Sequence, residues 1–256
     1  IGDSKSIRDI LMNAEIVVNT IGILNEFDQI NTFENIHFKF LQRLSQEMKV
    51  NKIKRFLHIS SLNAKINQMS DYLHTKGKAE NLILNEMSSF CNTTIFRPSI
   101  VFGEEDSFFN KFAKLLKFIP IFPLACPYAR FQPIYVGDLT DFMISCISNI
   151  ETYNKKIDTV GPKIYTFSEL IKLTTRTMGI RRVIIPLNDS LSKAQAYVFQ
   201  NLPGKLFTMD NYYSLQIDSV SENGYVGKTT VEHTLPNYLN IKDESEELRK
   251  KAGRKK

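Results

Sequence analysis

Two side chains that can cooperate in acid–base chemistry, Tyr72 and Lys76, lie four positions apart. A helix places residues at this spacing on one face, one turn from each other. A tyrosine with its ordinary pKa of about 10 is a poor proton donor or acceptor at neutral pH. An ammonium one turn away stabilises the phenolate, so we expect Lys76 to lower the pKa of Tyr72 towards neutrality.

A pair of serines precedes this helix and completes the candidate site. Ser60 and Ser61 end an apolar run that is typical of a buried strand, and a hydroxyl there can hold a carbonyl or hydroxyl oxygen beside the phenol. The spacing alone is weak, because Tyr238 and Lys242 repeat it without a serine-ended strand before them. We take that second pair as coincidence. The alternative for the first pair is a half-buried tyrosine beside a solvated lysine.

The elements that must position these residues alternate along the chain. Apolar runs of strand length are followed by stretches with helical periodicity, which is the pattern of βαβ units and a parallel α/β sheet. Ser70 stands where the N-cap of the helix carrying Tyr72 is expected. In the first half we expect strands over residues 16–22, 55–61 and 93–98, and helices over residues 4–13, 33–48 and 70–87.

After Gly103 the pattern changes to that of a smaller, mixed lobe. Residues 119–133 are rich in proline, and we expect them to be irregular. The remaining elements expected there are helices over residues 108–118, 137–148 and 167–178, and strands over residues 131–136, 156–160 and 182–187.

Charge and cysteine usage exclude several classes of function. The formal net charge of +6 resides in the last eight residues, which carry six Lys or Arg and no Asp or Glu. The rest of the chain is therefore neutral overall, unlike a nucleic-acid-binding protein with a distributed basic face. This tail is interpreted as a solvated, disordered end, or as a contact for anionic lipid or an acidic partner.

Neither a metal site nor a membrane span is indicated. Cys91, Cys126 and Cys146 form no paired motif, which argues against a zinc site or a disulfide framework. We expect no metal. No run of residues approaches the roughly 18–20 apolar residues that a membrane-spanning helix needs.

Four collinear stretches carry a resemblance to a known family: residues 17–24 (VVNTIGIL), 56–64 (FLHISSLNA), 97–112 and 130–138. Together with Tyr72-x-x-x-Lys76, they follow the order found in extended and atypical short-chain dehydrogenases/reductases. More narrowly, they resemble the NADPH-binding accessory subunits of respiratory complex I and their bacterial relatives, which are like NAD-dependent epimerases/dehydratases. The resemblance covers about residues 3–240 and extends through Val160-Gly161-Pro162 and Pro236-Asn237-Tyr238-Leu239.

The resemblance implies a Rossmann-type, doubly wound parallel sheet that holds NADP(H) or NAD(H) at the carboxyl ends of its strands. We expect a partial dinucleotide-binding domain over residues 1–150, a smaller lobe over 151–240, and a disordered basic tail over 241–256. The chain opens on Ile1, and it contains no match to the family's first strand and glycine-rich loop. We therefore expect an N-terminal segment, including the residue that selects NAD or NADP, to be absent.

The cofactor contacts are also implied by the resemblance, position by position. In the family, the matching residues lie after the strands and on the helix that faces the nicotinamide. Thr20, Ile21 and Gly22 would line the cofactor, Ser60 and Ser61 would lie near the nicotinamide, Tyr72 and Lys76 would hold its ribose, and Pro98, Ser99 and Ile100 would pass beside its amide.

Two main functions are compatible with this resemblance. The first is an accessory, non-catalytic subunit of complex I, whose cofactor serves stability and assembly. Its partners would be other complex I subunits and, through the basic tail, an anionic membrane surface. It would lie on the matrix side of the mitochondrial inner membrane, or on the cytoplasmic face of a bacterial membrane.

The second is a free NAD(P)-dependent reductase or epimerase, with Tyr72 as general acid/base, Lys76 tuning it and Ser61 clamping the substrate oxygen. Position 61 is often alanine or another residue in the accessory subunits, so the presence of Ser61 leaves the enzyme hypothesis open. A redox-sensing regulator without chemistry is a third alternative.

The other polar candidates are expected to be structural. Arg130 either meets a substrate phosphate or pairs with a neighbour such as Asp138. His58 is expected at an interior strand position, and neither His37 nor His233 has a partner that the sequence identifies. Loop and cap positions are expected for Glu104, Glu105 and Asp106.

The chain as given should bind dinucleotide poorly or not at all. The helix N-terminus that would hold the pyrophosphate belongs to the βαβ unit that we expect to be absent. Calorimetric titration of the chain with NADPH and with NADH checks this. A dissociation constant in the low micromolar range would contradict it.

Overall fold

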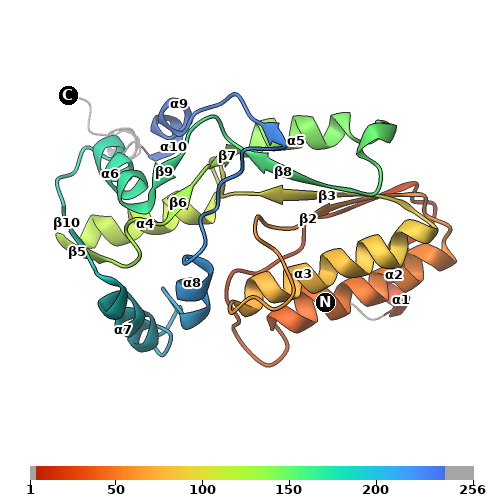
Figure 1. Cartoon of the computed structure of the whole chain (residues 1–256), viewed down its shortest axis with the longest axis horizontal. Helices are drawn as coiled ribbons and strands as arrows, with labels where there is room; N and C mark the ends of the chain where they lie inside the picture. The colour runs from red at the N-terminus through yellow and green to blue at the C-terminus, as the bar shows by residue number, and fades with distance from the viewer. Residues whose placement is uncertain (1–3, 240–256) are drawn as a thin grey trace, which may run out of the picture.

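A parallel sheet forms the centre of the molecule (Figure 1). The computed structural model describes residues 4–239, and its main sheet has five strands that are all parallel. In spatial order these are β1 (Ile16–Asn19), β2 (Arg55–Ile59), β3 (Asn92–Pro98), β8 (Lys155–Val160) and β11 (Tyr225–Val226). Because the strands are parallel, their carboxyl ends meet at one edge, which is where ligands bind in such sheets.

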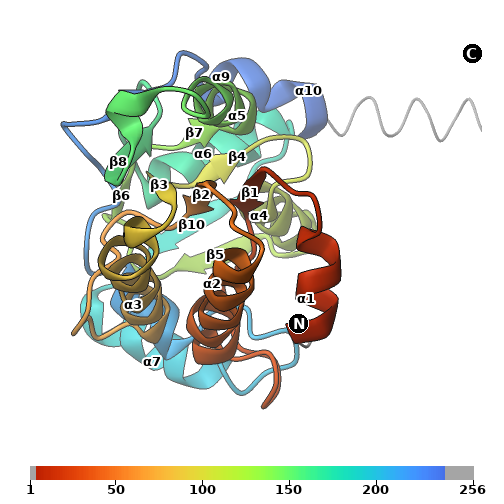
Figure 2. The same ribbon diagram turned by 90° about the vertical axis from the view of Figure 1, so that its right-hand side faces the viewer.

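Helices cover both faces of this sheet (Figure 2). One face is covered by α1 (Ser4–Leu11), α2 (Phe40–Val50) and α3 (Asp71–Asn85), and the other by α5 (Val136–Ser145). A π-helical turn, η1 (Glu34–Lys39), leads into α2, and two 3₁₀ turns, η2 (Met87–Ser89) and η3 (Ile150–Thr152), lie at chain turns. The parallel α/β sheet expected from the alternation and the doubly wound fold implied by the resemblance are both confirmed.

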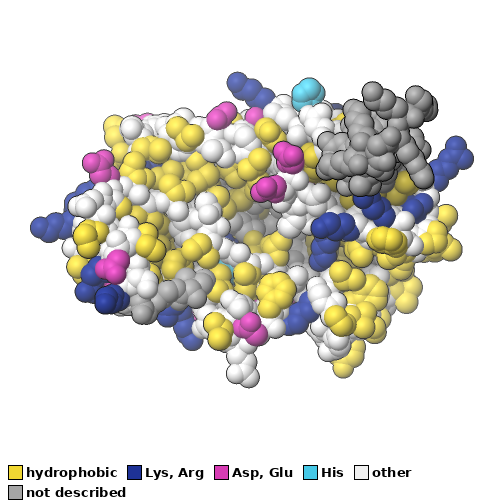
Figure 3. Space-filling view, turned by 180° about the vertical axis from the view of Figure 1, so that it is seen from behind, with side chains coloured by type: hydrophobic (Ala, Val, Ile, Leu, Met, Phe, Trp, Pro, Cys, Tyr) yellow, Lys and Arg dark blue, Asp and Glu magenta, His cyan; other side chains and the backbone are white. Residues whose placement is uncertain are grey.

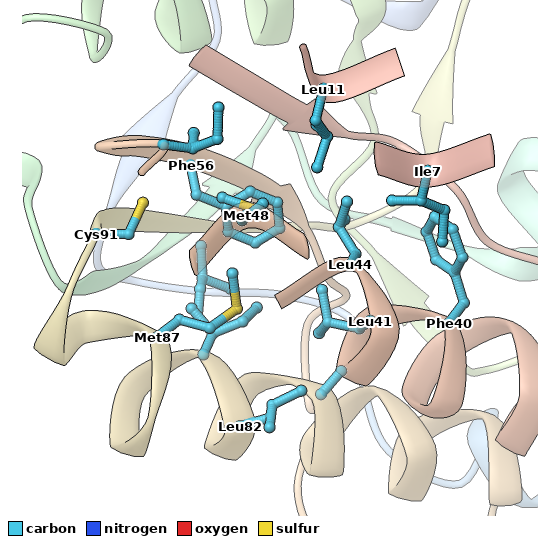
Figure 4. Close-up of a cluster of buried hydrophobic side chains, with 14 residues drawn as sticks. Ile7, Leu11, Phe40, Leu41, Leu44, Met48, Phe56, Leu82, Met87 and Cys91 are labelled. Carbon is cyan, nitrogen blue, oxygen red and sulfur yellow. The ribbon is translucent and has the colours of Figure 1, made fainter. Parts of the chain in front are cut away.

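The first core lies between the sheet and α1, α2 and α3 (Figure 4). Helix α2 turns one stripe of side chains inward, and these meet Phe56 of β2 and Leu82 of α3. On the opposite face of β2, Leu57 packs with residues of α5. The sequence of a strand that is buried on both faces in this way is a continuous apolar run and not an alternation of apolar and polar residues. The inward residues of α2 are Phe40, Leu41, Leu44 and Met48.

A smaller lobe is built on the side of α4 (Ser107–Phe118) and α6 (Phe167–Thr177), around a core rich in phenylalanine. It contains three short two-stranded sheets. These pair β5 (Ile121–Leu124) with β10 (Val183–Pro186), β4 (Val101–Phe102) with β7 (Ile134–Tyr135), and β6 (Arg130–Phe131) with β9 (Tyr165–Thr166). The remaining helices are α7 (Asp189–Phe199), α8 (Met209–Ser214), α9 (Val231–Thr234) and α10 (Pro236–Leu239).

Most of the expected elements are present, but residues 119–133 are not irregular throughout. They contain β5, which pairs with β10 more than fifty positions later in the sequence, and tertiary pairing of this kind overrides the local effect of proline on an edge strand. The single strand expected over residues 131–136 is two short strands, β6 and β7. The main sheet and the smaller lobe both draw on segments from either side of residue 150.

A buried carboxylate ties three strands to α3. Glu80 is fully buried, and its Oε1 accepts hydrogen bonds from Ser60 Oγ at 2.6 Å and Arg97 Nε at 2.8 Å. Lys156 Nζ lies 2.8 Å from Oε2. Its partners come from the end of β2, from β3 and from β8, so a single side chain of α3 fixes the helix against three neighbouring strands.

Replacement of Glu80 by alanine should lower the free energy of unfolding by about 3 kcal/mol, because it leaves Arg97 and Lys156, which are partly buried, without their buried partner. Urea unfolding followed by circular dichroism measures this. Glu34→Ala is the matched control, since Glu34 pairs with Lys78 near the surface and such pairs contribute about 1 kcal/mol or less. Equal losses in the two variants would contradict the prediction.

Candidate functional site

One cavity lies at the carboxyl ends of the parallel strands, between the main sheet and the smaller lobe. Its volume is about 370 Å³, within the range of small-molecule sites. Phe108 of α4 and Leu215, directly after α8, line it from the side of the lobe. The expected cofactor residues that line it are Thr20, Gly22, Ser60, Ser61, Tyr72, Lys76, Pro98, Ser99 and Ile100. The structure thus brings together nine of the ten positions taken from the family; Ile21 is outside the lining.

The turn after β1 is held by Asn19. The Asn19 Oδ1 accepts a hydrogen bond from the backbone N–H of Ile21 at 3.1 Å, and its Nδ2 lies 3.1 Å from Nδ1 of His58 on β2. This side chain therefore fixes the start of the loop that carries Thr20 and Gly22. Asn19 was not among the residues expected at the site, although its position at the end of a strand is a usable signal.

Lys76 is buried beneath this loop. Its side chain extends from α3 to the end of β2, where Nζ donates a hydrogen bond to the carbonyl oxygen of Ile59 at 3.0 Å. Burial lowers the pKa of Lys76 to about 8, against an opposing contribution from Glu80. A Cβ atom at position 22 would lie 3.2 Å from this ammonium, so Gly22 allows the loop to approach the lysine closely.

Helix α3 positions Tyr72 one turn before this lysine. The side chain of Ser70 accepts a hydrogen bond from Leu73 N–H, which confirms the expected cap. The carboxylate of Asp210, in α8, adds hydrogen bonds from the N–H groups of Asp71 and Tyr72. The smaller lobe thus fixes the start of the helix that carries the tyrosine.

The pKa of Tyr72 differs from the expectation. Burial raises it, and the charge of Asp210 raises it further, whereas a hydrogen bond with Ser61 opposes these effects. Lys76 is not among the groups that lower it, and its Nζ instead donates a hydrogen bond to the carbonyl oxygen of Ile59. The expectation that Lys76 lowers this pKa was therefore wrong for the structure as it stands.

The serine hydroxyls have different roles. Ser60 Oγ donates to the buried carboxylate of Glu80, so its hydroxyl serves the strand–helix junction. Ser61 is the one that interacts with Tyr72, and its Oγ also donates to Leu62 O at 3.2 Å. Ser99 Oγ donates to Ser219 O at 2.7 Å and joins the end of β3 to the lobe.

His37 is a site residue that the sequence did not identify. It is buried, and its Nε2 accepts the backbone N–H of Ile23 at 3.1 Å while its Nδ1 lies 3.0 Å from Thr75 Oγ1. Since that hydroxyl already donates to Asp71 O, the proton on His37 belongs on Nδ1. Burial, followed by the charge of Lys76, lowers the pKa of His37 to about 3. A neutral histidine thus clamps the loop after β1 to α3.

The aromatic surroundings strengthen this clamp. The His37 ring stacks on Phe33 with centroids 5.5 Å apart, and it meets the ring of Tyr72 edge-on at the same separation. His58 is almost completely buried, which agrees with its expected interior position, and burial holds its pKa well below the ordinary value. Its Nε2 has no hydrogen-bond partner among residues 4–239.

The remaining polar candidates have structural contacts. Arg130 pairs with Asp218, Nε to Oδ2 at 2.8 Å, and not with Asp138, which instead accepts backbone N–H groups at residues 228 and 229. Asp106 caps α4 as expected, and it also accepts a hydrogen bond from Tyr238 Oη at 2.6 Å. Within residues 4–239, no cluster of three or more His, Cys, Asp or Glu side chains is arranged to hold a metal.

His37→Phe should release the amide of Ile23. Phenylalanine keeps the ring contacts with Phe33 and Tyr72 but removes the acceptor, and loss of a buried hydrogen bond of about 1–3 kcal/mol corresponds to roughly tenfold faster exchange or more. Hydrogen exchange followed by NMR measures this.

The matched control is His74→Phe, because the Nδ1 of His74 accepts the N–H of Asn67 at 3.1 Å. That variant should speed exchange at Asn67 and leave Ile23 unchanged. An unchanged rate at Ile23 in His37→Phe would contradict the clamp.

Comparison with known sequences gives one family and a consistent set of relatives. Residues 58–170 match the 3-beta hydroxysteroid dehydrogenase/isomerase family. Over 173 residues, 66% of this chain and 44% of the relative, the chain is 31% identical to NADH dehydrogenase [ubiquinone] 1 alpha subcomplex subunit 9, mitochondrial, of Mus musculus. The protein of the same name from Dictyostelium discoideum is 26% identical over 220 residues, 85% of this chain and 59% of that protein. The chain thus spans about half the length of these relatives.

Solved structures agree on the fold. UDP-glucuronic acid 4-epimerase from Bacillus cereus, solved with UDP-glucuronic acid and NAD, has a TM-score of 0.67 at 15% identity, covering 93% of this chain and 80% of the enzyme. RMD from Pseudomonas aeruginosa, complexed with NADPH, has a TM-score of 0.65 at 15% identity, covering 93% of this chain and 84% of that protein. No helix within residues 4–239 is both long enough and apolar enough to cross a bilayer. The resemblance drawn from the motifs is confirmed: the chain is similar to the 3-beta hydroxysteroid dehydrogenase/isomerase family and to alpha subcomplex subunit 9 of mitochondrial NADH dehydrogenase.

Proposed function

We propose that this chain is part of an accessory subunit of respiratory complex I that holds a nicotinamide dinucleotide without turning it over. The observation that carries the proposal is the cavity at the strand ends, in which Lys76, Tyr72, Gly22 and the residues after β3 converge. It is supported by the relatives, which are named as subunits of mitochondrial NADH dehydrogenase.

The lining fits the nicotinamide riboside half of NADP(H) or NAD(H). The Lys76 ammonium has three N–H groups. One donates a hydrogen bond to Ile59 O, and the other two can donate to ribose hydroxyls. Gly22 leaves room above that ammonium. In the proposal Tyr72 and Lys76 hold the ribose, Ser61 lies by the nicotinamide, and Pro98, Ser99 and Ile100 pass beside its amide, with Thr20 and Ile21 in the loop over the ribose.

The protonation behaviour of the site supports a binding role over a catalytic one. A tyrosine that acts as general acid/base at neutral pH needs its pKa lowered, and here burial raises it. A neutral phenol instead donates a good hydrogen bond. A cofactor that binds only the native state stabilises the subunit by mass action, and this requires no turnover.

The proposal includes other complex I subunits as partners and a peripheral position on the matrix side of the mitochondrial inner membrane. The mitochondrial location is supported by the relatives, which are named as mitochondrial proteins. The basic tail over residues 241–256, with its expected contact to an anionic membrane, lies outside the described residues.

A free reductase or epimerase is the second candidate, favoured by the hydrogen bond between Ser61 and Tyr72, which is the contact such an enzyme would use. Tyr72→Phe distinguishes the two functions. A tagged protein is expressed in cells of its own species that lack the endogenous copy, and membranes are separated on native gels and stained for NADH dehydrogenase activity.

The subunit proposal predicts that the tagged protein migrates with the stained complex and that Tyr72→Phe changes the amount of complex by less than about twofold, since the loss is one hydrogen bond. Gly22→Val is the matched variant: its Cβ would lie 3.2 Å from Lys76 Nζ, so the branched side chain crowds the buried ammonium and should deplete the complex. A soluble tagged protein that consumes NAD(P)H, with consumption abolished by Tyr72→Phe, would favour the enzyme instead.

A further inference from the structure

The small sheet formed by β5 and β10 has an apolar outer face. The two strands are parallel, with Val183 opposite Ile121 and Ile185 opposite Pro123. Side chains alternate along a strand, so these four residues share one side, whereas Phe122 and Leu124 point to the other and are buried in the lobe. All four are exposed. We call them the β5–β10 face: Ile121, Pro123, Val183 and Ile185.

This exposure is large for strand residues. Val183 is 59% and Ile121 56% exposed, and Phe118, three positions before β5, is 85% exposed. Parallel strands are normally covered on both faces, and contiguous apolar surface on a soluble protein marks an interaction site.

The two segments that form this face carry charges of one sign. The segments that form it and lead into it, residues 107–125 and 178–188, contain five cationic side chains and no Asp or Glu. Lys117 stands next to Phe118, and Arg181 and Arg182 directly precede β10. The five cations are Lys111, Lys114, Lys117, Arg181 and Arg182.

The contacts of Arg182 suit a diffuse partner. Its Nε donates to Leu116 O at 2.6 Å and its Nη2 to Lys117 O at 3.0 Å, so the guanidinium caps the end of α4. These N–H groups already donate to backbone carbonyl groups, but the guanidinium of Arg182 keeps its positive charge. Such a group attracts an anionic surface without forming the bidentate pairs with carboxylates that anchor arginine at protein–protein interfaces.

The position of the face also suits a flat partner. Figure 1 places β5 and β10 at one end of the long axis, on the far side of α4 and α6 from the helices α1 and α2. In the view from behind, hydrophobic and Lys or Arg side chains gather at that same end, on the right (Figure 3). A terminal face can meet a plane without obstruction from the rest of the molecule.

We propose that the β5–β10 face docks on an anionic lipid bilayer. Phe118, Ile121 and Val183 enter the headgroup region, and the five cations lie over lipid phosphates. This goes beyond the assignment to complex I and does not depend on it, since neither the cofactor cavity nor the basic tail takes part.

The test is co-sedimentation of the whole chain with vesicles of phosphatidylcholine mixed with phosphatidylglycerol, and with vesicles of phosphatidylcholine alone. The triple variant Phe118→Ser, Ile121→Thr, Val183→Thr retains the tail and changes only exposed side chains. Its partition coefficient on the anionic vesicles should fall at least about tenfold. Circular dichroism verifies that the variant is folded.

Two further variants separate charge from apolar contact. Lys114→Gln, Lys117→Gln, Arg181→Gln should weaken binding to the anionic vesicles by a similar factor, and raised salt should do the same for the unaltered chain. The matched controls replace exposed residues elsewhere and should bind like the unaltered chain. The control for the apolar variant is the triple variant Ile10→Ser, Val50→Ser, Ile150→Ser. The control for the charge variant is the triple variant Lys5→Gln, Lys52→Gln, Lys155→Gln.

Three outcomes would overturn the proposal. The first is that the unaltered chain binds neither kind of vesicle. The second is that the face variant binds as well as the unaltered chain, which would assign the binding to the tail or to another surface. The third is that the unaltered chain is a dimer, which the face variant converts to a monomer without any lipid binding; the face would then be a contact between copies of this chain.

Discussion

The ammonium group of Lys76, buried between α3 and the ends of β1 and β2, is the constraint on which the site depends. It must find a hydrogen-bond acceptor away from water, and Ile59 O supplies one. Burial, together with the charge of Lys76, keeps His37 neutral, and a neutral His37 can accept the backbone N–H of Ile23. The loop after β1 is thereby held over the lysine, at a point where a Cβ atom on residue 22 would lie only 3.2 Å from the ammonium. A cavity of defined shape follows from these linked contacts.

Helix α3 carries a second constraint one turn further along the same face. Glu80, one turn after Lys76, gathers Ser60, Arg97 and Lys156 and so fixes the helix across β2, β3 and β8. Asp210 fixes its first turn from the smaller lobe. The position of Tyr72 and Lys76 is therefore set by the main sheet and the lobe together. Preorganisation of this kind suits the holding of a cofactor whether or not chemistry follows.

The parts of the fold that local sequence determines could be predicted. The buried strands, the Ser70 cap and the convergence of residues after β1, β2 and β3 all follow from periodicity, capping chemistry and parallel connection. What could not be predicted depends on partners distant in sequence. His37 gains its role from Ile23 and Thr75, β5 exists because β10 pairs with it, and Arg130 finds Asp218 in place of Asp138. The expectation for the pKa of Tyr72 failed for a related reason, since a four-residue spacing does not reveal that the phenol is buried or that Asp210, distant in sequence, lies near it.

The most direct test of this account is the titration of Lys76 itself. In protein labelled with ¹³C at lysine Cε, the Lys76 signal, assigned with Lys76→Met, should titrate with a midpoint near 8, because burial lowers the pKa to about 8. In that case the native state releases this proton at a lower pH than the unfolded chain does, and the free energy of unfolding rises with pH between the two pKa values. A midpoint at the ordinary lysine value of about 10.4 would contradict the account, because the ammonium would then be solvated and the linked contacts of the site would lack their origin.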